Sequence, residues 1–144
     1  MPDYDAALQE IRRVLKPGGK LCVSVPHAWP EKICWQLAPA PGGYAYQPGG
    51  HIRIFDEVDL KQSVERRGFK LFRRHHAHGI HSPLWWLKCL FWARRDDHPM
   101  VNAYHSFLVW DLMKKPWLTR ALDWLLSPVM GKSLVLYFDA EDKV

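Results

Sequence analysis

The chain opens with an amphipathic pattern that predicts a helix over residues 5–16. Apolar residues recur at helical spacing at Leu8, Ile11 and Leu15, with charged or amide side chains between them. Residues 17–19 are Pro-Gly-Gly. Proline cannot continue a helix and glycine tolerates positive φ, so the helix is expected to end there.

A short apolar run follows at residues 21–25 and ends at Pro26. It lacks a regular polar alternation, which is typical of a strand buried on both faces, as in a parallel sheet. Residues 27–50 are rich in Pro and Gly with scattered aromatic residues. We therefore expect a long loop there, of the kind that is functional or disordered in compact domains.

Residues 56–59, Asp-Glu-Val-Asp, carry an N-cap signal that predicts a helix running to Arg67 and ending at Gly68. Residues 69–74 then predict a strand. This strand carries three cations, namely Lys70, Arg73 and Arg74. Because charged side chains on a strand oppose pairing between molecules, we expect it at an edge of the sheet.

The pattern between residues 82 and 131 predicts two or three helices, at about 83–95, 100–115 and 117–126. Pro83 and Pro116 suit first-turn positions, whereas Pro99 and Pro128 suit boundaries. Residues 133–138 form a last apolar run that predicts a buried strand. The order is helix, strand, long loop, helix, strand, helical insert, strand, which α/β architecture accommodates.

The composition indicates a contact surface, and the sequence shows no targeting signal. The 144 residues carry a net charge of +5, eight His and eight Trp. Basic charge attracts nucleic acid, anionic lipid or acidic substrates without distinguishing them. The N-terminus has no signal-peptide pattern. The longest hydrophobic stretch, residues 84–92, has about half the length of the ~20-residue segment that a membrane span needs.

Cysteine and histidine usage does not favour a disulfide framework or a metal site. Cys22, Cys34 and Cys89 are odd in number and widely spaced, which fits core packing in a reducing, cytoplasmic setting. The histidines cluster at residues 75, 76, 78 and 81. The first two would face opposite sides of a strand, and no carboxylate or cysteine stands at matching spacing.

Residues 7–21 read ALQEIRRVLKPGGKL. This stretch resembles the helix, turn and fifth strand of class I S-adenosylmethionine-dependent methyltransferases of the ubiquinone and menaquinone biosynthesis type. Residues 51–55, the helix after them and the Gly68-Phe69 turn resemble the segment leading into the sixth strand. Residues 132–139 would be the seventh strand, antiparallel and inserted between the fifth and the sixth. The resemblance covers about 5–79 and the last strand.

The fold that this resemblance implies is the C-terminal half of a Rossmann-like methyltransferase sheet, with the helical insert at 82–131 before the last strand. We expect a partial methyltransferase domain over residues 1–144. The family holds the methyl donor, S-adenosylmethionine, with a Gly-rich turn after its first strand and an acid ending its second. No Gly-x-Gly-x-Gly occurs here, so the chain alone is expected to bind the donor poorly and to be inactive.

Four residues are the candidates for the acceptor side of such a reaction. His51 lies in the part that resembles the family and is the candidate catalytic base, since a neutral imidazole can take a proton during methyl transfer. His27 follows the fifth strand and is a second such histidine. His27, Trp29, His51 and Arg53 are the candidate substrate-binding residues. The acceptor is expected to be small and hydrophobic.

The insert brings six Trp together with six basic residues, and three interpretations stay open. Its helices could sit at a membrane surface, cover a hydrophobic acceptor as a lid, or pack their aromatic side chains in a core of their own. The alternative function is a non-catalytic, basic and Trp-rich module that docks on a lipid surface or a partner protein. Nucleic-acid binding is not favoured, because no binding module is present.

Overall fold

The computed structural model describes residues 4–39, 41–46 and 53–141 of the chain. The chain divides into two compact units. The sheet unit comprises Met1–Val25, Phe55–His75 and Leu134–Val144. The helical unit comprises Pro26–Ile54 and His76–Ser133. Each unit is described by itself.

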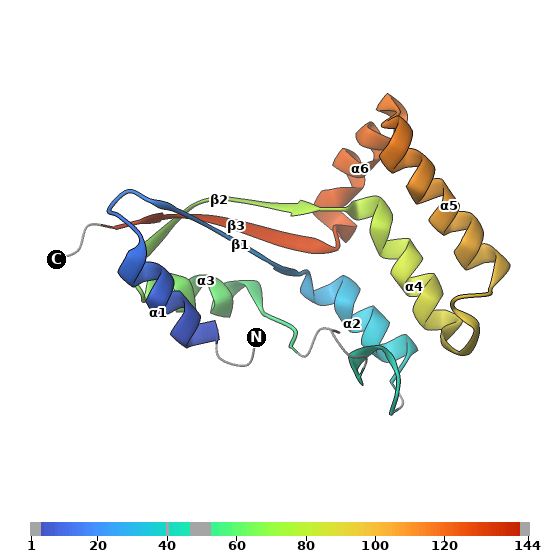
Figure 1. The fold of residues 1–144 in the computed structure, drawn as a ribbon, viewed down its shortest axis with the longest axis horizontal. Helices are drawn as coiled ribbons and strands as arrows, with labels where there is room; N and C mark the ends of the chain where they lie inside the picture. The colour runs from blue at the N-terminus through green and yellow to red at the C-terminus, as the bar shows by residue number, and fades with distance from the viewer. Residues whose placement is uncertain (1–3, 40, 47–52, 142–144) are drawn as a thin grey trace. The chain divides into compact units, whose positions relative to one another are not determined.

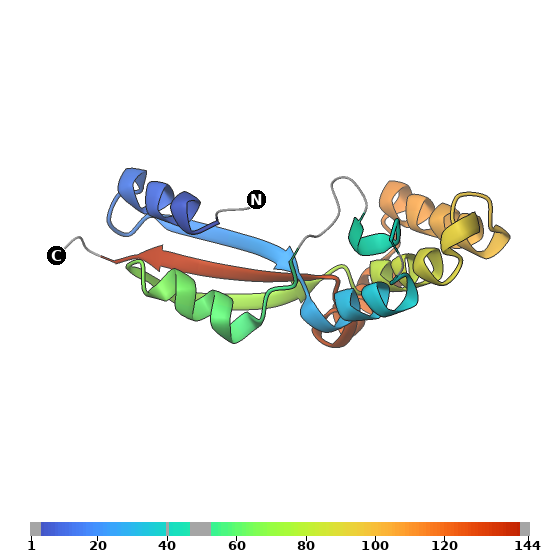
Figure 2. The same cartoon turned by 90° about the horizontal axis from the view of Figure 1, so that it is seen from below.

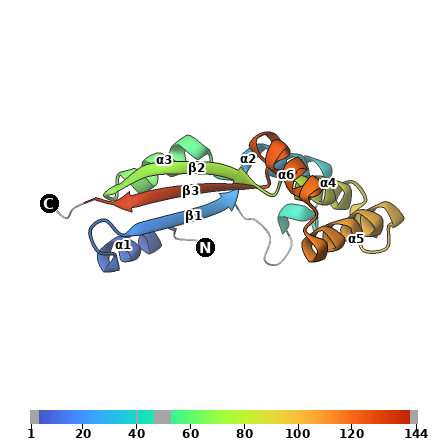
Figure 3. The ribbon, with the colours of Figure 1, turned by 90° about the horizontal axis from the view of Figure 1, so that it is seen from above.

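Three strands form one sheet in the order β1-β3-β2 (Figure 3). Their bounds are β1 Lys20–Pro26, β2 Phe69–Ala77 and β3 Ser133–Ala140. The Gly18 N–H bonds to the Ala140 carbonyl oxygen at 2.9 Å, whereas the Glu141 N–H bonds to that of Gly68 at 3.0 Å. The predictions that the charged strand lies at an edge and the last strand lies between the other two are both confirmed. Their numbering as fifth, sixth and seventh strands stays a prediction.

The sheet unit has two helices, α1 Tyr4–Val14 and α3 Glu57–Glu65. Both cover the same face of the sheet (Figure 1), with α1 on the β1 side and α3 on the β2 side (Figure 2). The core between helices and sheet consists of Leu8, Leu60, Val64, Phe69, Leu134, Leu136, Phe138 and Ala140. Fully burying one such large side chain contributes about 1.5–3 kcal/mol.

The predicted helix boundaries are set by the expected local signals. The Asp56 carboxylate accepts from the N–H groups of Val58 and Asp59, as an N-cap residue does. After α1, Gly18 adopts a φ of 70°, which favours glycine. The Ala140 N–H then bonds to the Gly19 carbonyl oxygen at 2.8 Å. The Pro-Gly-Gly turn therefore ends α1 and also begins the pairing with β3.

The prediction that β1 is buried on both faces is wrong. Leu21, Val23 and Val25 pack against the core, but Cys22 and Ser24 are exposed on the opposite face. The expectation that Cys22 is a core residue fails for the same reason. Small side chains at both positions hide the alternation from a hydrophobicity pattern, and no helix of the described sheet unit covers that face.

The helical unit contains α2 Ala28–Leu37, α4 Ser82–Leu90, α5 Pro99–Lys114 and α6 Trp117–Met130, with short 3₁₀ turns at Tyr44–Tyr46, Gly79–His81 and Trp92–Arg94. Helix α2 falls in the stretch that was predicted to be a loop. Pro30 lies in its first turn, where a missing N–H is tolerated, and the Pro- and Gly-rich sequence begins only after it ends. The long loop is therefore shorter than expected.

The insert helices agree with the pattern except at their ends. Pro83 and Pro99 lie in the first turn of α4 and α5. Pro128 was predicted to be a boundary but lies inside α6, which continues to Met130 and ends at Gly131. No helix in the described part of the chain is long and apolar enough to cross a membrane.

The tryptophans of the insert separate into two groups. Trp85, Trp86 and Trp92 are partly buried and pack on a cluster formed by Cys34, Ala38, Tyr44 and Cys89. The three tryptophans of α4 and of the turn after it therefore pack inside the helical unit. Trp110, Trp117 and Trp124 of α5 and α6 are exposed.

The outer edge of β1 is open, because β3 is its one hydrogen-bonded neighbour among the described residues. The Gly19 carbonyl oxygen accepts from the Ala140 N–H, and the His27 N–H donates to the Lys132 carbonyl oxygen. In an antiparallel ladder alternate residues face the partner strand, so the odd-numbered residues of β1 face β3. The N–H of Ser24 then points to the open edge.

We expect the chain to self-associate at micromolar concentration through this edge, because unpaired strand edges accept another strand. Ser24→Pro removes the outward N–H without touching a β1–β3 bond and should shift the chain toward the monomer. Ser24→Ala, which keeps that N–H, is the control. Sedimentation velocity distinguishes the species, and a wild-type chain that runs as a single monomer would contradict the expectation.

Candidate functional site

The ring and backbone of His27, directly after β1, are both fixed within the helical unit. Its N–H donates to the Lys132 carbonyl oxygen at 2.8 Å, and its Nδ1 lies 2.9 Å from the Gly131 carbonyl oxygen. A carbonyl oxygen can only accept, so Nδ1 carries a proton, and in the neutral ring Nε2 keeps its lone pair. His27 therefore offers one nitrogen that can take a proton from a ligand.

Trp29, in the first turn of α2, places an apolar ring beside His27. The two ring centroids lie 6.2 Å apart, and the Trp86 ring is 5.7 Å from Trp29 on another side. The indole N–H of Trp29 donates to the Val129 carbonyl oxygen at 2.8 Å. The side chain remains 40% exposed. The structure thus brings together two of the four predicted residues, an imidazole ring and an apolar ring.

The C-terminal end of α6 holds both side chains. The last carbonyl groups of a helix have no partner inside it. In α6 the carbonyl oxygens of residues 129, 130 and 131 accept from the side chains of Trp29, Ser82 and His27, respectively. Side chains from outside the helix therefore satisfy its end, and the same bonds set the orientation of the two candidate residues.

His51 lies outside the described residues. Arg53 is exposed in the segment that precedes α3. Their assignment to substrate binding, and that of His51 to catalysis, stays a prediction.

The histidines at residues 75, 76, 78 and 81 have different surroundings. The His75 ring stacks on Tyr137, with centroids 5.6 Å apart, whereas the His76 ring stacks on His27 at 4.1 Å. Burial lowers the pKa of His81, whose ring meets that of His78 edge-on. No group of three metal-binding side chains occurs among the residues that the structure describes.

A buried polar cluster that the sequence did not reveal lies behind the first turn of α2. Glu31 is 2% exposed and accepts a hydrogen bond from the Tyr44 hydroxyl at 3.3 Å. The Lys132 ammonium lies 3.7 Å from the centre of the Trp85 ring. These side chains leave no room for a water molecule between Glu31, Lys132 and their neighbours. The cluster is therefore packed structure and not a ligand pocket.

Burial controls the ionisation of this cluster. It lowers the pKa of Lys132 to about 8, although the Glu31 carboxylate acts in the opposite direction. A hydrogen bond to Cys89, together with burial, raises the pKa of the Cys34 thiol, and the same bond lowers the pKa of Cys89. Both thiols are buried, which confirms the core assignment for these two cysteines.

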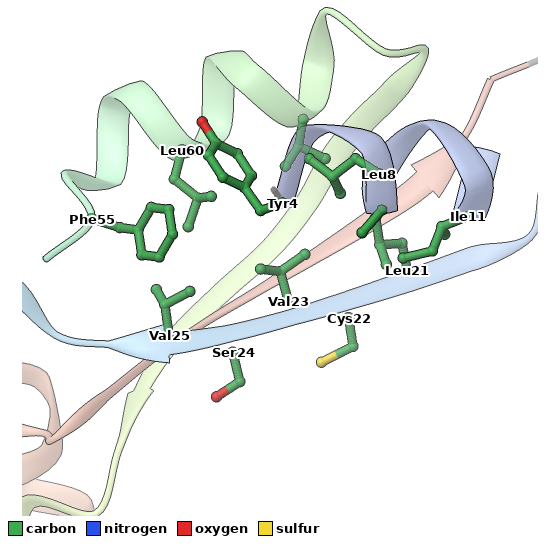
Figure 4. A pocket seen from close by; sticks show the side chains of 12 residues that line it. Tyr4, Leu8, Ile11, Leu21, Cys22, Val23, Ser24, Val25, Phe55 and Leu60 are labelled. Carbon is green, nitrogen blue, oxygen red and sulfur yellow. The ribbon is translucent and has the colours of Figure 1, made fainter. Parts of the chain in front are cut away.

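The sheet unit contains an apolar cavity of about 270 Å³ along β1. Leu21, Val23 and Val25 point toward α1 and Phe55, whereas Cys22 and Ser24 point away (Figure 4). The Tyr4 hydroxyl, at its rim, lies 3.4 Å from the Ser63 hydroxyl. The cavity can hold apolar groups, but the side chains that point into it include no acid or base.

The first half of the chain matches a known family. A family model described as a methyltransferase domain matches residues 1–73, a little over half of the chain. The chain belongs to this methyltransferase domain family. No curated protein matches it. The match spans α1, β1, α2, α3 and most of β2, so it includes His27, Trp29 and Arg53. Methyltransferase domains generally use S-adenosylmethionine as the methyl donor.

The desolvated, half-buried Lys132 predicts a measurable pH dependence of stability. The folded chain holds the Lys132 proton only below about pH 8, whereas an unfolded lysine holds it to about pH 10.4. The unfolded state thus binds more protons in this window, so stability rises with pH. Between about pH 7.5 and 9.5 the wild type should gain about 2 kcal/mol more unfolding free energy than Lys132→Met.

Urea unfolding followed by circular dichroism at the two pH values measures this difference. Lys88→Met is the matched control, since its ammonium also lies near the Trp85 ring, at 5.7 Å, and it should keep the wild-type slope. Parallel pH dependences for wild type and Lys132→Met would show that Lys132 is not desolvated.

Proposed function

We propose that this methyltransferase domain contributes the acceptor side of an S-adenosylmethionine-dependent methyl transfer to a small, hydrophobic acceptor. The family match over residues 1–73 supports methyl transfer. The observation that supports a role on the acceptor side is the orientation of His27. Its Nδ1 is bonded to the Gly131 carbonyl oxygen, and Nε2 is left for a ligand beside the Trp29 ring.

Two features of this chain argue against a complete site for the donor. No Gly-x-Gly-x-Gly occurs in the sequence. The first carboxylate after β1, that of Glu31, is buried and bonded to Tyr44, so it is not available for ribose hydroxyls. We assign no donor contact to the described residues.

On the acceptor side, the neutral His27 ring can accept one proton at Nε2. A hydroxyl or carbon acid that gains a methyl group loses one proton, and His27 would hold that proton before releasing it to water. Trp29 would pack on the apolar part of the acceptor and keep water from it. We therefore propose His27 as a candidate catalytic base, in addition to His51, which the sequence suggested.

The alternative is a non-catalytic, basic and Trp-rich module. The outward apolar face of α5 and α6 favours a docking role, and docking is compatible with either function. Donor-dependent chemistry separates the two, because a module that only docks releases no S-adenosylhomocysteine.

The 144-residue chain should show no binding of S-adenosylmethionine by isothermal titration calorimetry. The physical reason is that the sequence has no Gly-x-Gly-x-Gly turn for the donor and that the Glu31 carboxylate, bonded to Tyr44, is not available for its ribose. A measured dissociation constant in the micromolar range would contradict our expectation that this chain alone does not bind S-adenosylmethionine. S-adenosylhomocysteine, which shares the ribose, serves as a second ligand in the same experiment.

The role of His27 is tested in the protein encoded by the complete open reading frame that contains this chain, assayed by S-adenosylhomocysteine release with a detergent-dispersed lipid extract as the acceptor source. His27→Gln keeps a donor for the Gly131 carbonyl oxygen but removes the base. We expect kcat to fall by about 10²–10⁴ and its acidic pH limb to disappear. His105→Gln, an exposed histidine of α5, should leave both unchanged.

Two other outcomes have separate meanings. An unchanged turnover and pH profile in His27→Gln would exclude His27 as the base and leave His51 to be tested. A lack of any donor-dependent release by the wild type would favour the non-catalytic module.

A further inference from the structure

Helix α6 presents its polar face to the protein and its apolar face to solvent. Thr119, Asp123 and Ser127 recur every four residues and therefore lie on one side of the helix. Asp123 accepts from the Ile80 N–H at 3.0 Å, and Ser127 Oγ accepts from the Gly79 N–H at 3.1 Å. The polar side of α6 is thus used to satisfy backbone groups of the 79–81 turn.

The opposite side of α6 is apolar and exposed. Trp117 is 78% exposed and Trp124 is 79% exposed. Leu118, Leu125 and Val129 are also largely exposed. At 100° per residue these positions, with Leu122, span an arc of roughly 160° on the helical wheel. A surface helix of a globular protein normally buries its apolar face and exposes its polar face, and α6 does the opposite.

The turn before α6 continues this apolar surface. Leu112 and Met113, at the end of α5, are about as exposed as the tryptophans. Figure 1 shows α5 and α6 as a hairpin joined by a short turn. We call the exposed apolar residues of this hairpin, with Lys114, Lys115 and Arg120, the α5–α6 surface.

The exposed charge of the α5–α6 surface is cationic. The two acids of helices α5 and α6, Asp111 and Asp123, are half-buried. Asp111 accepts from the Thr119 hydroxyl, and Asp123 accepts from the Ile80 N–H. Lys114, Lys115 and Arg120 remain exposed. Lys115 adopts a φ of 47° in the turn itself, so the two lysines lie between Met113 and Trp117 at the tip of the hairpin.

We propose that the α5–α6 surface docks on an anionic phospholipid surface, with Trp117, Trp124 and their apolar neighbours in the headgroup region and Lys114, Lys115 and Arg120 on lipid phosphates. Tryptophan suits this depth because its ring is apolar and its N–H is polar. The combination of a broad apolar face with cations at its border is that of helices that lie in a membrane interface. The proposal does not depend on methyl transfer.

Vesicle co-sedimentation tests the proposal with the wild-type chain. The probes are phosphatidylcholine vesicles and vesicles in which about one-third of the lipid is phosphatidylglycerol, which has a negative headgroup. We expect binding to the anionic vesicles that weakens with added salt, and much weaker binding to phosphatidylcholine alone. No sedimentation with anionic vesicles would overturn the proposal.

Two pairs of variants assign the binding to the α5–α6 surface. Trp117→Ser with Trp124→Ser should lower the partition coefficient on anionic vesicles by at least about tenfold. Val58→Ser, which removes an exposed apolar residue of α3, should leave it unchanged. Lys114→Glu with Lys115→Glu should also lower it by more than about tenfold, whereas Lys16→Glu with Lys70→Glu, the same charge change in the sheet unit, should lower it less.

Folding of each variant is checked by its thermal midpoint, which should stay at the wild-type value because the substituted side chains are exposed. Binding that survives the Trp117 and Trp124 substitutions would overturn the proposal. So would a dimer that these substitutions dissolve while vesicles are not bound, because a second copy would then cover the surface. Running the series also in the Ser24→Pro background separates this dimer from association through β1.

Discussion

The backbone and side chain of Lys132 together fix the point at which the chain returns from the helical unit. Its N–H bonds to the His78 carbonyl oxygen, and its own carbonyl oxygen accepts from the His27 N–H at 2.8 Å. The excursion from residue 79 to residue 131 thus begins and ends at one hydrogen-bonded pair, so its helices can be accommodated without changing the register of β3. The cost is a half-buried, desolvated lysine whose ammonium lies over the Trp85 ring, near Glu31. A neutral side chain there would avoid the desolvation but would leave Glu31 without the nearby cation.

Elements that depend on local signals could be predicted from the sequence. The apolar spacing and the Pro-Gly-Gly stop defined α1, and Asp56 defined the start of α3. The charge of residues 69–74 placed β2 at an edge, and the apolar run near the C-terminus placed β3 in the interior. The motif at residues 7–21, together with the order of the elements after it, indicated the methyltransferase family that the first half of the chain matches.

What could not be predicted depends on partners far away in sequence. Helix α2 was hidden because its segment is adjacent to Pro- and Gly-rich residues, and its start is held by carbonyl oxygens at the end of α6. Glu31 is buried beside Tyr44 and near Lys132, and no local pattern connects Lys132 to it. The exposed face of β1 was missed because Cys22 and Ser24 are small, and exposure of a face depends on which elements cover it. In α6, the pattern predicted the helix correctly but could not say that Thr119, Asp123 and Ser127, rather than the leucines, face the protein.

Helix α6 contributes residues to both of our proposals. Its outward face carries the exposed tryptophans, and its C-terminal carbonyl groups orient Trp29 and His27. A small hydrophobic acceptor would concentrate in a lipid phase, so an enzyme that methylates it gains from residing at that surface. Docking through α6 would then bring the domain to its acceptor. The proposed methyl transfer and the proposed lipid docking therefore use residues of the same helical unit and are compatible with each other.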